Sequence, residues 1–310
     1  MTNALCPSDG RCLEVPTTGQ RHEATDTELG FPGRATLLMS VYMHDSAALF
    51  RRALDSVFMN SIKLEHALVV VDGPVGLDID NVLNDFASRE GLEILRLPAN
   101  IGLASALNAG LEQVRTEWVV RADADDINVP TRFAIQAQFA RANANLDLFG
   151  GAIDEYDAQG LRLARRTVPQ SGADIRRRMP YRNPFNHMTM AFRASAVRDA
   201  GGYPQLHLRE DYGLWARLVA SGAQCANVPD VLVHATTGRN MYRRRGGWRY
   251  ARSEIELQRY LARCGLKSSA AGAVHGVLRS FVFLLPAVAR GWLYERALRT
   301  RVSASNFTSS

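Results

Sequence analysis

Acidic side chains that follow one apolar segment are the residues best suited to chemistry. Asp123, Asp125 and Asp126 come directly after the segment WVVRA. Burying this much negative charge without a partner is costly, so the pattern indicates a bound cation. In an extended chain Asp123 and Asp125 point to one side, and carboxylate oxygens favour Mg²⁺ or Mn²⁺, ions that bridge diphosphate oxygens. The alternative is an acidic helix N-cap before Pro130, which Asp126 fits.

A second acidic pair, Glu210 and Asp211, begins the segment EDYGLWARL, which also carries Trp215. The helix dipole alone favours acids at a helix N-terminus. In a cleft, however, one such carboxylate can act as a general base toward a hydroxyl group. We therefore predict that this pair is catalytic, and we expect Trp215 to contact an acceptor or a sugar.

Polar side chains also crowd residues 182–193, the segment RNPFNHMTMAFR. This density in a predicted loop is typical of hydrogen bonding to a polyhydroxylated ligand, so we expect sugar or acceptor contacts from Asn183, Asn186 and His187. A lone histidine is more often structural than catalytic, so a structural role for His187 stays open.

Arginine accounts for most of the net charge of +6 and is clustered at 176–178 and 239–252. Guanidinium groups grip phosphate oxygens in pairs, so Arg244 and Arg245 are predicted to hold a diphosphate; a solvated basic face is the alternative. No nucleic-acid motif accompanies the charge, and we predict no nucleic-acid partner. A nucleotide, a lipid diphosphate and an anionic bilayer fit the charge equally well.

Apolar strands must position these side chains, and they alternate with amphipathic helices. Strands are expected at 35–43, 66–73, 92–98 and 117–126, and helices at 47–60, 80–89 and 102–114. This order predicts an α/β protein with a Rossmann-like, mostly parallel sheet and helices on both faces. Ligands bind beyond the carboxyl ends of such strands, so Ser40, Asp72 and the acids from Asp123 onward are expected at one crevice.

Three parts of the chain differ in character. Residues 1–33 lack periodicity and predict a disordered leader, 34–240 form the expected catalytic domain, and 241–310 form a C-terminal helical segment. The scattered cysteines and the absence of an apolar N-terminal run predict a cytoplasmic protein.

The C-terminal segment is apolar between residues 271 and 294, but charges and Pro286 interrupt it. Its longest uncharged run is well short of the roughly 20 residues that a spanning helix needs. We predict a helix at the inner face of the cytoplasmic membrane, with Phe281 and Phe283 toward lipid and Arg279 attracting anionic headgroups. The alternative is a helix that packs on its own domain.

Eight motifs occur in order between residues 35 and 250, and through them the chain resembles family 2 glycosyltransferases with the GT-A fold. The motifs are MSVYMHD, VVVDGP, PANIGLASALNAGL, VVRADADDINVPTRF, RNPFNHMTMAFR, GGYP, EDYGLW and MYRRRGGWRY. Within the family the chain is similar to exopolysaccharide transferases of the amylovoran-synthesis type. The resemblance implies a metal-dependent, inverting hexosyltransferase. Its donor would be a nucleoside-diphosphate sugar, expected to be a UDP-sugar, and its acceptor a lipid-diphosphate-linked glycan intermediate.

The resemblance also implies roles for single residues. Asp123 would touch ribose or diphosphate, and Asp125 would bind Mn²⁺ or Mg²⁺. Asp211 would deprotonate the acceptor hydroxyl, with Glu210 as the second candidate. His234 precedes the position where many relatives have a histidine ligand, so the third metal ligand stays open. The residues expected around the nucleobase and along the nucleotide pocket are Ser40, Val41, Tyr42, Asp72, Asn100, Gly102 and Asn108.

Two other function classes fit the sequence less well. A Mg²⁺-dependent phosphohydrolase with an aspartate nucleophile has the motif DxDx[TV], whereas Asp126 and Ile127 follow Asp125 here. A catalytically idle scaffold of the same fold is expected to have lost Asp125 or Asp211, and both are present.

Overall fold

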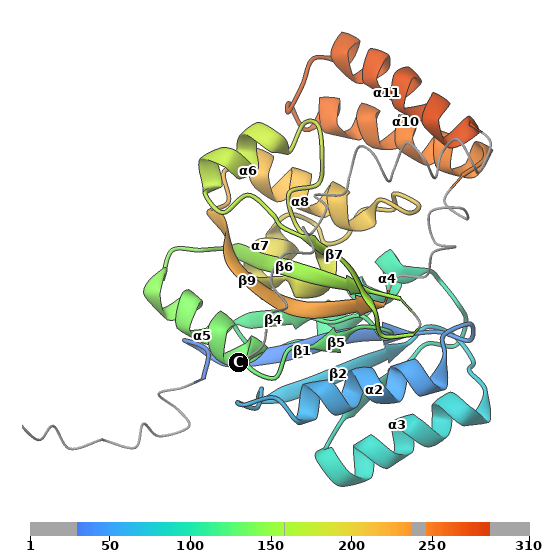
Figure 1. Ribbon diagram of the computed structural model, residues 1–310, viewed down its shortest axis with the longest axis vertical. Helices are drawn as coiled ribbons and strands as arrows, with labels where there is room; N and C mark the ends of the chain where they lie inside the picture. Colours follow the sequence, from blue (N-terminus) through green and yellow to red (C-terminus); the bar gives the residue numbers. More distant parts are fainter. Residues whose placement is uncertain (1–29, 158, 237–245, 286–310) are drawn as a thin grey trace, which may run out of the picture.

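A parallel sheet forms the first half of the computed structural model, which describes residues 30–157, 159–236 and 246–285 (Figure 1). Its strands are β1 (Ala35–Val41), β2 (His66–Val71), β3 (Glu93–Arg96) and β4 (Trp118–Arg121), in the order β3-β2-β1-β4. The strands β1, β2 and β4 are almost fully buried, because helices cover both of their faces.

Alternation along β1 divides the core between the two faces of the sheet. Leu37 and Met39 pack with α2 (Ala47–Phe58) and α3 (Leu77–Glu90), whereas Leu38 packs with α4 (Leu103–Gln113). The two layers lie below and above the sheet in Figure 1. These strands and helices lie where the sequence predicts them, except that β4 ends at Arg121, five residues before the expected end, so that the acids from Asp123 onward follow the strand.

The second half makes the sheet mixed. The strand β8 (Ala191–Arg193) pairs antiparallel with β4 and with β6 (Leu148–Tyr156), and β9 (Cys225–Thr236) pairs parallel with β6. The strands β5 (Ile127–Asn128) and β7 (Arg162–Arg166) pair antiparallel with β9 and β6. The helices are α5 (Arg132–Ala142), α6 (Gly172–Arg178), α7 (Ala194–Asp199) and α8 (Glu210–Ala220), with a 3₁₀ turn at His187–Thr189. Parallel pairing therefore dominates only in the first half.

Two C-terminal helices, α10 (Trp248–Arg263) and α11 (Ser269–Leu284), pack against each other beside α8 (Figure 1). Gly272 permits their close contact, since a Cβ atom there would lie 3.1 Å from the Gln258 carbonyl oxygen. None of the helices in the described ranges is long and apolar enough to cross a membrane.

Two side chains expected at a lipid surface face the protein instead. Phe283 is buried and stacks on Tyr250, and the Arg279 guanidinium Nε lies 2.6 Å from a carboxylate oxygen of the buried Glu254. Phe281 is exposed, as expected. The helix α11 thus packs on its own domain with one side and leaves the other side open.

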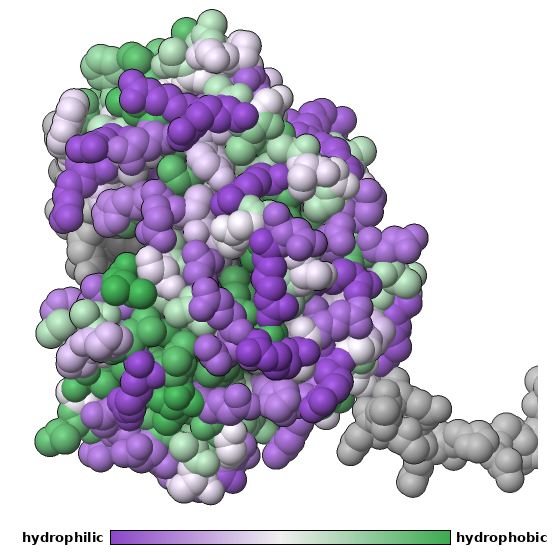
Figure 2. Space-filling model, turned by 180° about the vertical axis from the view of Figure 1, so that it is seen from behind, coloured by the Kyte–Doolittle hydropathy of each residue, from purple (hydrophilic) through white to green (hydrophobic). Residues whose placement is uncertain are grey.

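Polarity is unevenly distributed over the face opposite to that of Figure 1. Figure 2 shows hydrophilic side chains over much of its upper part. Hydrophobic side chains gather in its lower half, the half that holds β1 to β3 with α2 and α3.

Candidate active site

A cavity of about 590 Å³ opens at the carboxyl ends of β1, β2 and β4. Its wall is completed by the first residues of α4, the loop at 205–208 and the start of α8. The parallel strands place side chains from distant parts of the sequence around one space, as the rule for α/β sheets predicts. The predicted site residues that line it are Ser40, Tyr42, Asp72, Asn100, Gly102, Asp123, Asp125, His187 and Glu210.

Backbone contacts shape the wall between β2 and α4. The Asp72 carboxylate accepts hydrogen bonds from the backbone N–H groups of Ile101 (2.7 Å) and Gly102 (3.0 Å). Gly73 has φ +85°, and a Cβ atom there would lie 2.5 Å from the Asn100 nitrogen. Only glycine at this position lets the end of β2 approach the 99–102 loop so closely.

The acids after β4 form a cluster with Asp45, which the sequence analysis did not identify. Burial raises the pKa of Asp123, but the surrounding positive charges, of which the Arg121 guanidinium 2.7 Å away is the strongest, together outweigh burial, and the pKa is lowered. Burial and the neighbouring Asp123 and Asp45 raise the pKa of Asp125 to about 6. Burial, together with Asp123 and Asp125, raises the pKa of Asp126 well above its ordinary value. The cluster thus holds more negative charge than its arginines balance.

A divalent cation fits this donor set, because it would relieve the repulsion that raises these pKa values. Asp123 and Asp125 both line the cavity. Asp126 is turned away, since its Oδ1 accepts a hydrogen bond from the Thr236 backbone N–H at 3.1 Å. It does not cap α5, which begins at Arg132. In the part of the chain that the structure describes, no three His, Cys, Asp or Glu side chains are grouped to hold a metal ion.

Arg121 organises the floor of the cavity, although the sequence analysis gave it no role. Its side chain donates to His187 Nε2 (3.1 Å), to the Leu38 carbonyl oxygen (3.2 Å) and to Asp123. Because His187 Nε2 accepts, the imidazole is neutral with its proton on Nδ1. Burial lowers the pKa of His187, in keeping with the neutral form. The signal in the sequence was an arginine inside an apolar strand, two residues before an acid.

The two adjacent acids of α8 lie in different surroundings. Glu210 lines the cavity, and burial together with Asp211 raises its pKa to about 7. Asp211 is not among the lining residues, and its Oδ2 accepts a hydrogen bond from Asn183 Nδ2 at 3.0 Å. Of the pair, Glu210 is therefore the carboxylate that the structure exposes to a ligand in the cavity.

The family model for glycosyl transferase family 2 matches residues 36–201. The chain belongs to glycosyltransferase family 2. It is 34% identical over 263 residues to the amylovoran biosynthesis glycosyltransferase AmsE of Erwinia amylovora, covering 84% of this chain and 98% of that protein. It is also 32% identical over 265 residues to the Escherichia coli UDP-Gal:alpha-D-GlcNAc-diphosphoundecaprenol beta-1,3-galactosyltransferase. This match covers 85% of this chain and 96% of that protein.

Solved structures show that this glycosyltransferase has the predicted GT-A fold. S. aureus TarS 1-349 in complex with UDP-GlcNAc gives a TM-score of 0.61 at 15% identity, covering 86% of this chain and 76% of that one. The mannosyltransferase PcManGT from Pyrobaculum calidifontis, in complex with GDP-Man and Mn²⁺, gives a TM-score of 0.57 at 17% identity. This match covers 87% of this chain and 76% of that one. The predicted family and fold are confirmed.

Several predicted site residues of the glycosyltransferase lie away from the cavity. Val41 is buried in the core. Asn108 exchanges two hydrogen bonds with the Tyr203 backbone, at 2.7 and 2.9 Å, and so supports the loop that leads to residue 205. Asn186 is buried and donates to the Gly151 carbonyl oxygen at 2.8 Å. Their positions support structural roles.

Trp215 and His234 are also remote from the cavity. Trp215 is fully buried and packs against Phe185 and Phe192, so its position supports core packing rather than the predicted sugar contact. His234 lies in β9 with its ring 4.9 Å from that of Tyr156 and does not line the cavity. The predicted phosphate contacts Arg244 and Arg245 lie outside the described residues, as does the leader up to residue 29.

The loop before α8 supplies four lining residues that were not predicted from the sequence. Gln205, Leu206, His207 and Leu208 all face the cavity. Leu208 has φ +64°, in the left-handed region that disfavours a branched side chain. No motif marks this loop in the sequence, so only the structure reveals it.

Proposed function

We propose that this family 2 glycosyltransferase moves a hexose from a nucleoside-diphosphate sugar, a UDP-sugar by preference, to a lipid-diphosphate-linked glycan. The reaction belongs to exopolysaccharide or other cell-surface glycan synthesis, and it inverts the anomeric carbon. One observation carries the proposal: the acids after β4 and Glu210 of α8 face the same cavity. A diphosphate and an attacking hydroxyl can therefore be held beside one sugar.

The names of the relatives support the choice of substrates. One acts in amylovoran biosynthesis, and another is named for transfer of galactose from UDP-Gal to GlcNAc-diphosphoundecaprenol. Both relatives are matched over nearly their whole length.

Donor binding uses the side of the cavity formed by β1, β2 and α4. Tyr42, Ile101 and Leu103 line the cavity with exposed apolar surface, on which a nucleobase can pack. Asp72 holds the 101–102 backbone in place, and Ser40 adds a hydroxyl group. These residues orient the donor so that its diphosphate lies over Asp123 and Asp125.

Asp125 and Asp123 would hold Mn²⁺ or Mg²⁺. The cation, when bound, neutralises charge on the departing diphosphate. Arg121 keeps Asp123 ionised and oriented, since it holds this carboxylate at 2.7 Å. The cluster is therefore suited to a ligand that brings both a cation and phosphate oxygens.

Glu210 is the general base that the geometry favours, and Asp211 is the second candidate. The carboxylate takes the proton of the acceptor hydroxyl while the oxygen of that hydroxyl forms a bond to the anomeric carbon. The bond from that carbon to the diphosphate oxygen breaks on the opposite face, which inverts the configuration. A base with a pKa near 7 is well matched to this proton transfer at neutral pH.

Membrane attachment is the last part of the proposal. Val274, Val277, Leu278 and Phe281 are exposed along α11, spaced so that they share one face. An interfacial helix of this kind would place the protein on the inner face of the cytoplasmic membrane, beside a lipid-linked acceptor.

A transfer assay tests the function. Purified protein is incubated with UDP- and GDP-sugars, Mn²⁺ and a GlcNAc-diphosphate lipid, and the product linkage is read by NMR. We expect transfer from one UDP-sugar with inverted anomeric configuration. Release of phosphate from phosphomonoesters would instead indicate a phosphohydrolase. Absence of turnover with every donor, together with intact nucleotide binding, would indicate an idle scaffold.

A further inference from the structure

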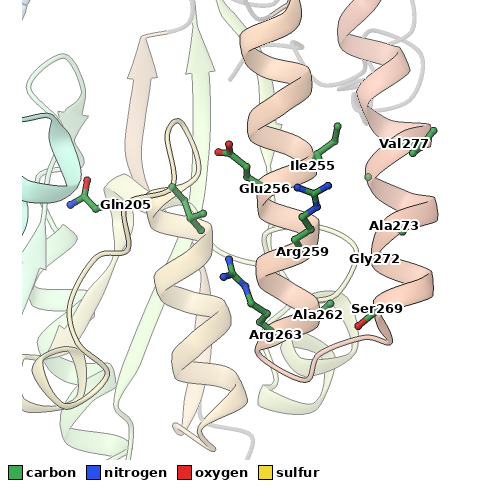
Figure 3. A pocket seen from close by; sticks show the side chains of 12 residues that line it. Gln205, Ile255, Glu256, Arg259, Ala262, Arg263, Ser269, Gly272, Ala273 and Val277 are labelled. Carbon is green, nitrogen blue, oxygen red and sulfur yellow. The ribbon is translucent and has the colours of Figure 1, made fainter.

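A second cavity, of about 910 Å³, lies over α10 between α11 and the loop at 205–206 (Figure 3). Arg259 and Arg263 project from α10 one helical turn apart, and α11 contributes Gly272, Ala273 and Val277. Side chains this small on α11 leave open space above α10. Its volume is within the range typical of ligand sites, roughly 300–1,000 Å³.

This second cavity, called the groove below, adjoins the cavity of the active site. Gln205 and Leu206 line both spaces. The Gln205 side chain is tied to α4, since its Nε2 donates to Ser105 Oγ at 2.9 Å. A molecule lying in the groove therefore reaches Glu210 by crossing this loop.

The charge of the groove suits a phosphate group. Arg259 and Arg263 are exposed, and within the described residues neither forms an ion pair. The carboxylate of Glu256, which also lines the groove, is paired with Arg252 at 2.8 Å. The Arg263 guanidinium lies over the Tyr260 ring, 5.6 Å from its centroid, but neither guanidinium is held by a carboxylate. Both can therefore bind an anion, and their planar forks match phosphate oxygens.

The far side of the groove is apolar. Val277 lines the groove and is 54% exposed, and Leu278 and Phe281 continue the exposed surface along α11. From the active site outward, a ligand thus meets the loop that carries Gln205, then two arginines, then an apolar helix face. A lipid-linked acceptor has its groups in the same order: sugar, diphosphate, lipid.

We propose that this groove binds the diphosphate and first lipid carbons of the acceptor, with Arg259 and Arg263 as the diphosphate contacts. The inference rests on the proposed function and adds the acceptor site to it. It explains why two helices outside the sheet pack beside the start of α8, where the acceptor hydroxyl must meet its base.

Binding of short isoprenoids tests the groove without requiring turnover. Affinities of farnesyl diphosphate, farnesyl monophosphate, farnesol and inorganic pyrophosphate are measured by calorimetry for the full-length protein. We expect the diphosphate lipid to bind most tightly. The variants Arg259→Ala and Arg263→Ala should each lower the affinity for farnesyl diphosphate about tenfold, the loss typical of a hydrogen bond to a charged group. Arg52→Ala, which removes an exposed charge from α2, is the control and should bind as the parent does.

A steric variant separates the groove from general electrostatics. Ala273 is exposed and lines the groove, so Ala273→Trp should fill the space without disturbing the core. We expect it to raise the acceptor KM in the transfer assay while leaving UDP affinity unchanged. Equal binding of farnesyl diphosphate by the parent, the arginine variants and Ala273→Trp would overturn the inference. So would equal affinity for farnesyl diphosphate and pyrophosphate. If the parent transfers sugar in either case, the proposed function stands.

Discussion

The carboxylates around the cavity differ in the charge that each one carries at neutral pH. Arg121 keeps the pKa of Asp123 low, whereas burial and acidic neighbours raise the pKa of Asp125 to about 6. Burial and Asp211 raise that of Glu210 to about 7. Asp125 gains most from a cation, and Glu210 is closest to the pKa expected of a base at neutral pH.

The first prediction concerns Asp125. We expect Asp125→Asn to retain the fold and the circular dichroism spectrum but to lose transfer, because the cation then loses a ligand. In the parent protein, Asp125 takes up a proton as the pH falls through about 6, so Mn²⁺ affinity should decrease from pH 7.5 to pH 5. Calorimetric titration with Mn²⁺ in the presence of UDP measures this. Full activity in EDTA would refute the metal role.

The second prediction separates the two acids of α8. Glu210→Gln should lower the rate of transfer roughly a hundredfold or more, with UDP affinity little changed. In the parent, transfer should fall as the pH drops below about 7, because the base becomes protonated. Asp211→Asn removes a like charge, so it should move this acidic limb to lower pH. If Asp211→Asn is inactive and Glu210→Gln is active, Asp211 is the base, as the family resemblance implied.

Among the elements, α10 and α11 matter for catalysis because they pack beside the start of α8, where the candidate base Glu210 lies. Glu254 of α10 is fully buried and pairs with Arg209 (3.0 Å) and Arg279 (2.6 Å). Arg209 directly precedes Glu210, so this charge network fixes the start of α8. The two C-terminal helices are therefore part of the frame that holds the candidate base.

The third prediction tests this network. Glu254→Ala removes a fully buried carboxylate and leaves the partly exposed Arg209 and Arg279 without their partner, so it should lower the free energy of unfolding by about 1.5–3 kcal/mol. Glu256→Ala, on the same helix, removes a partly exposed partner of Arg252 and should cost less than about 1 kcal/mol. Urea unfolding of both variants measures the difference. Similar midpoints for the two would show that the buried network does not hold the helices in place.

At the scale of the whole molecule, three surfaces follow one another: the donor cavity, the groove over α10 and the open face of α11. The alternative of a packed helix holds for the side of α11 that carries Phe283, and the predicted membrane contact would use the exposed side that carries Phe281. Removing residues 271–310 would take away both sides together with Arg279, so substitutions on the exposed side are the sharper test.

The fourth prediction concerns this exposed side. Leu278→Glu with Phe281→Glu should release the protein from anionic vesicles, since it replaces apolar surface by charge that anionic lipid repels. Leu77→Glu, on the highly exposed start of α3, is the matched control and should leave binding unchanged. Co-sedimentation with vesicles measures both. Unchanged sedimentation of the double variant would show that another surface makes the membrane contact.

Sequence alone determined much of this protein, because the deciding signals are local. Apolar runs of strand length predict β1 to β4, since strands buried on both faces need continuous hydrophobic residues. Acids that directly follow such a strand predict a cluster at its carboxyl end, and the structure lines the cavity with Asp123 and Asp125. Eight ordered motifs were enough to identify the family, which the family model confirms.

Only the tertiary structure decided which polar residues face the cavity. The strand β8 spans three residues, so its sequence carries too little periodicity to predict it, and its pairing with β4 and β6 depends on distant partners. Glu210 and Asp211 are adjacent, yet neighbours on a helix point about 100° apart, and the packing of α8 selects which one meets the ligand. Arg121 and Trp215 illustrate both kinds of error. Arg121 had no predicted role but contacts site residues, whereas Trp215 was predicted to contact a sugar but lies in the core. The residue type alone does not tell whether a side chain faces the cavity or the core.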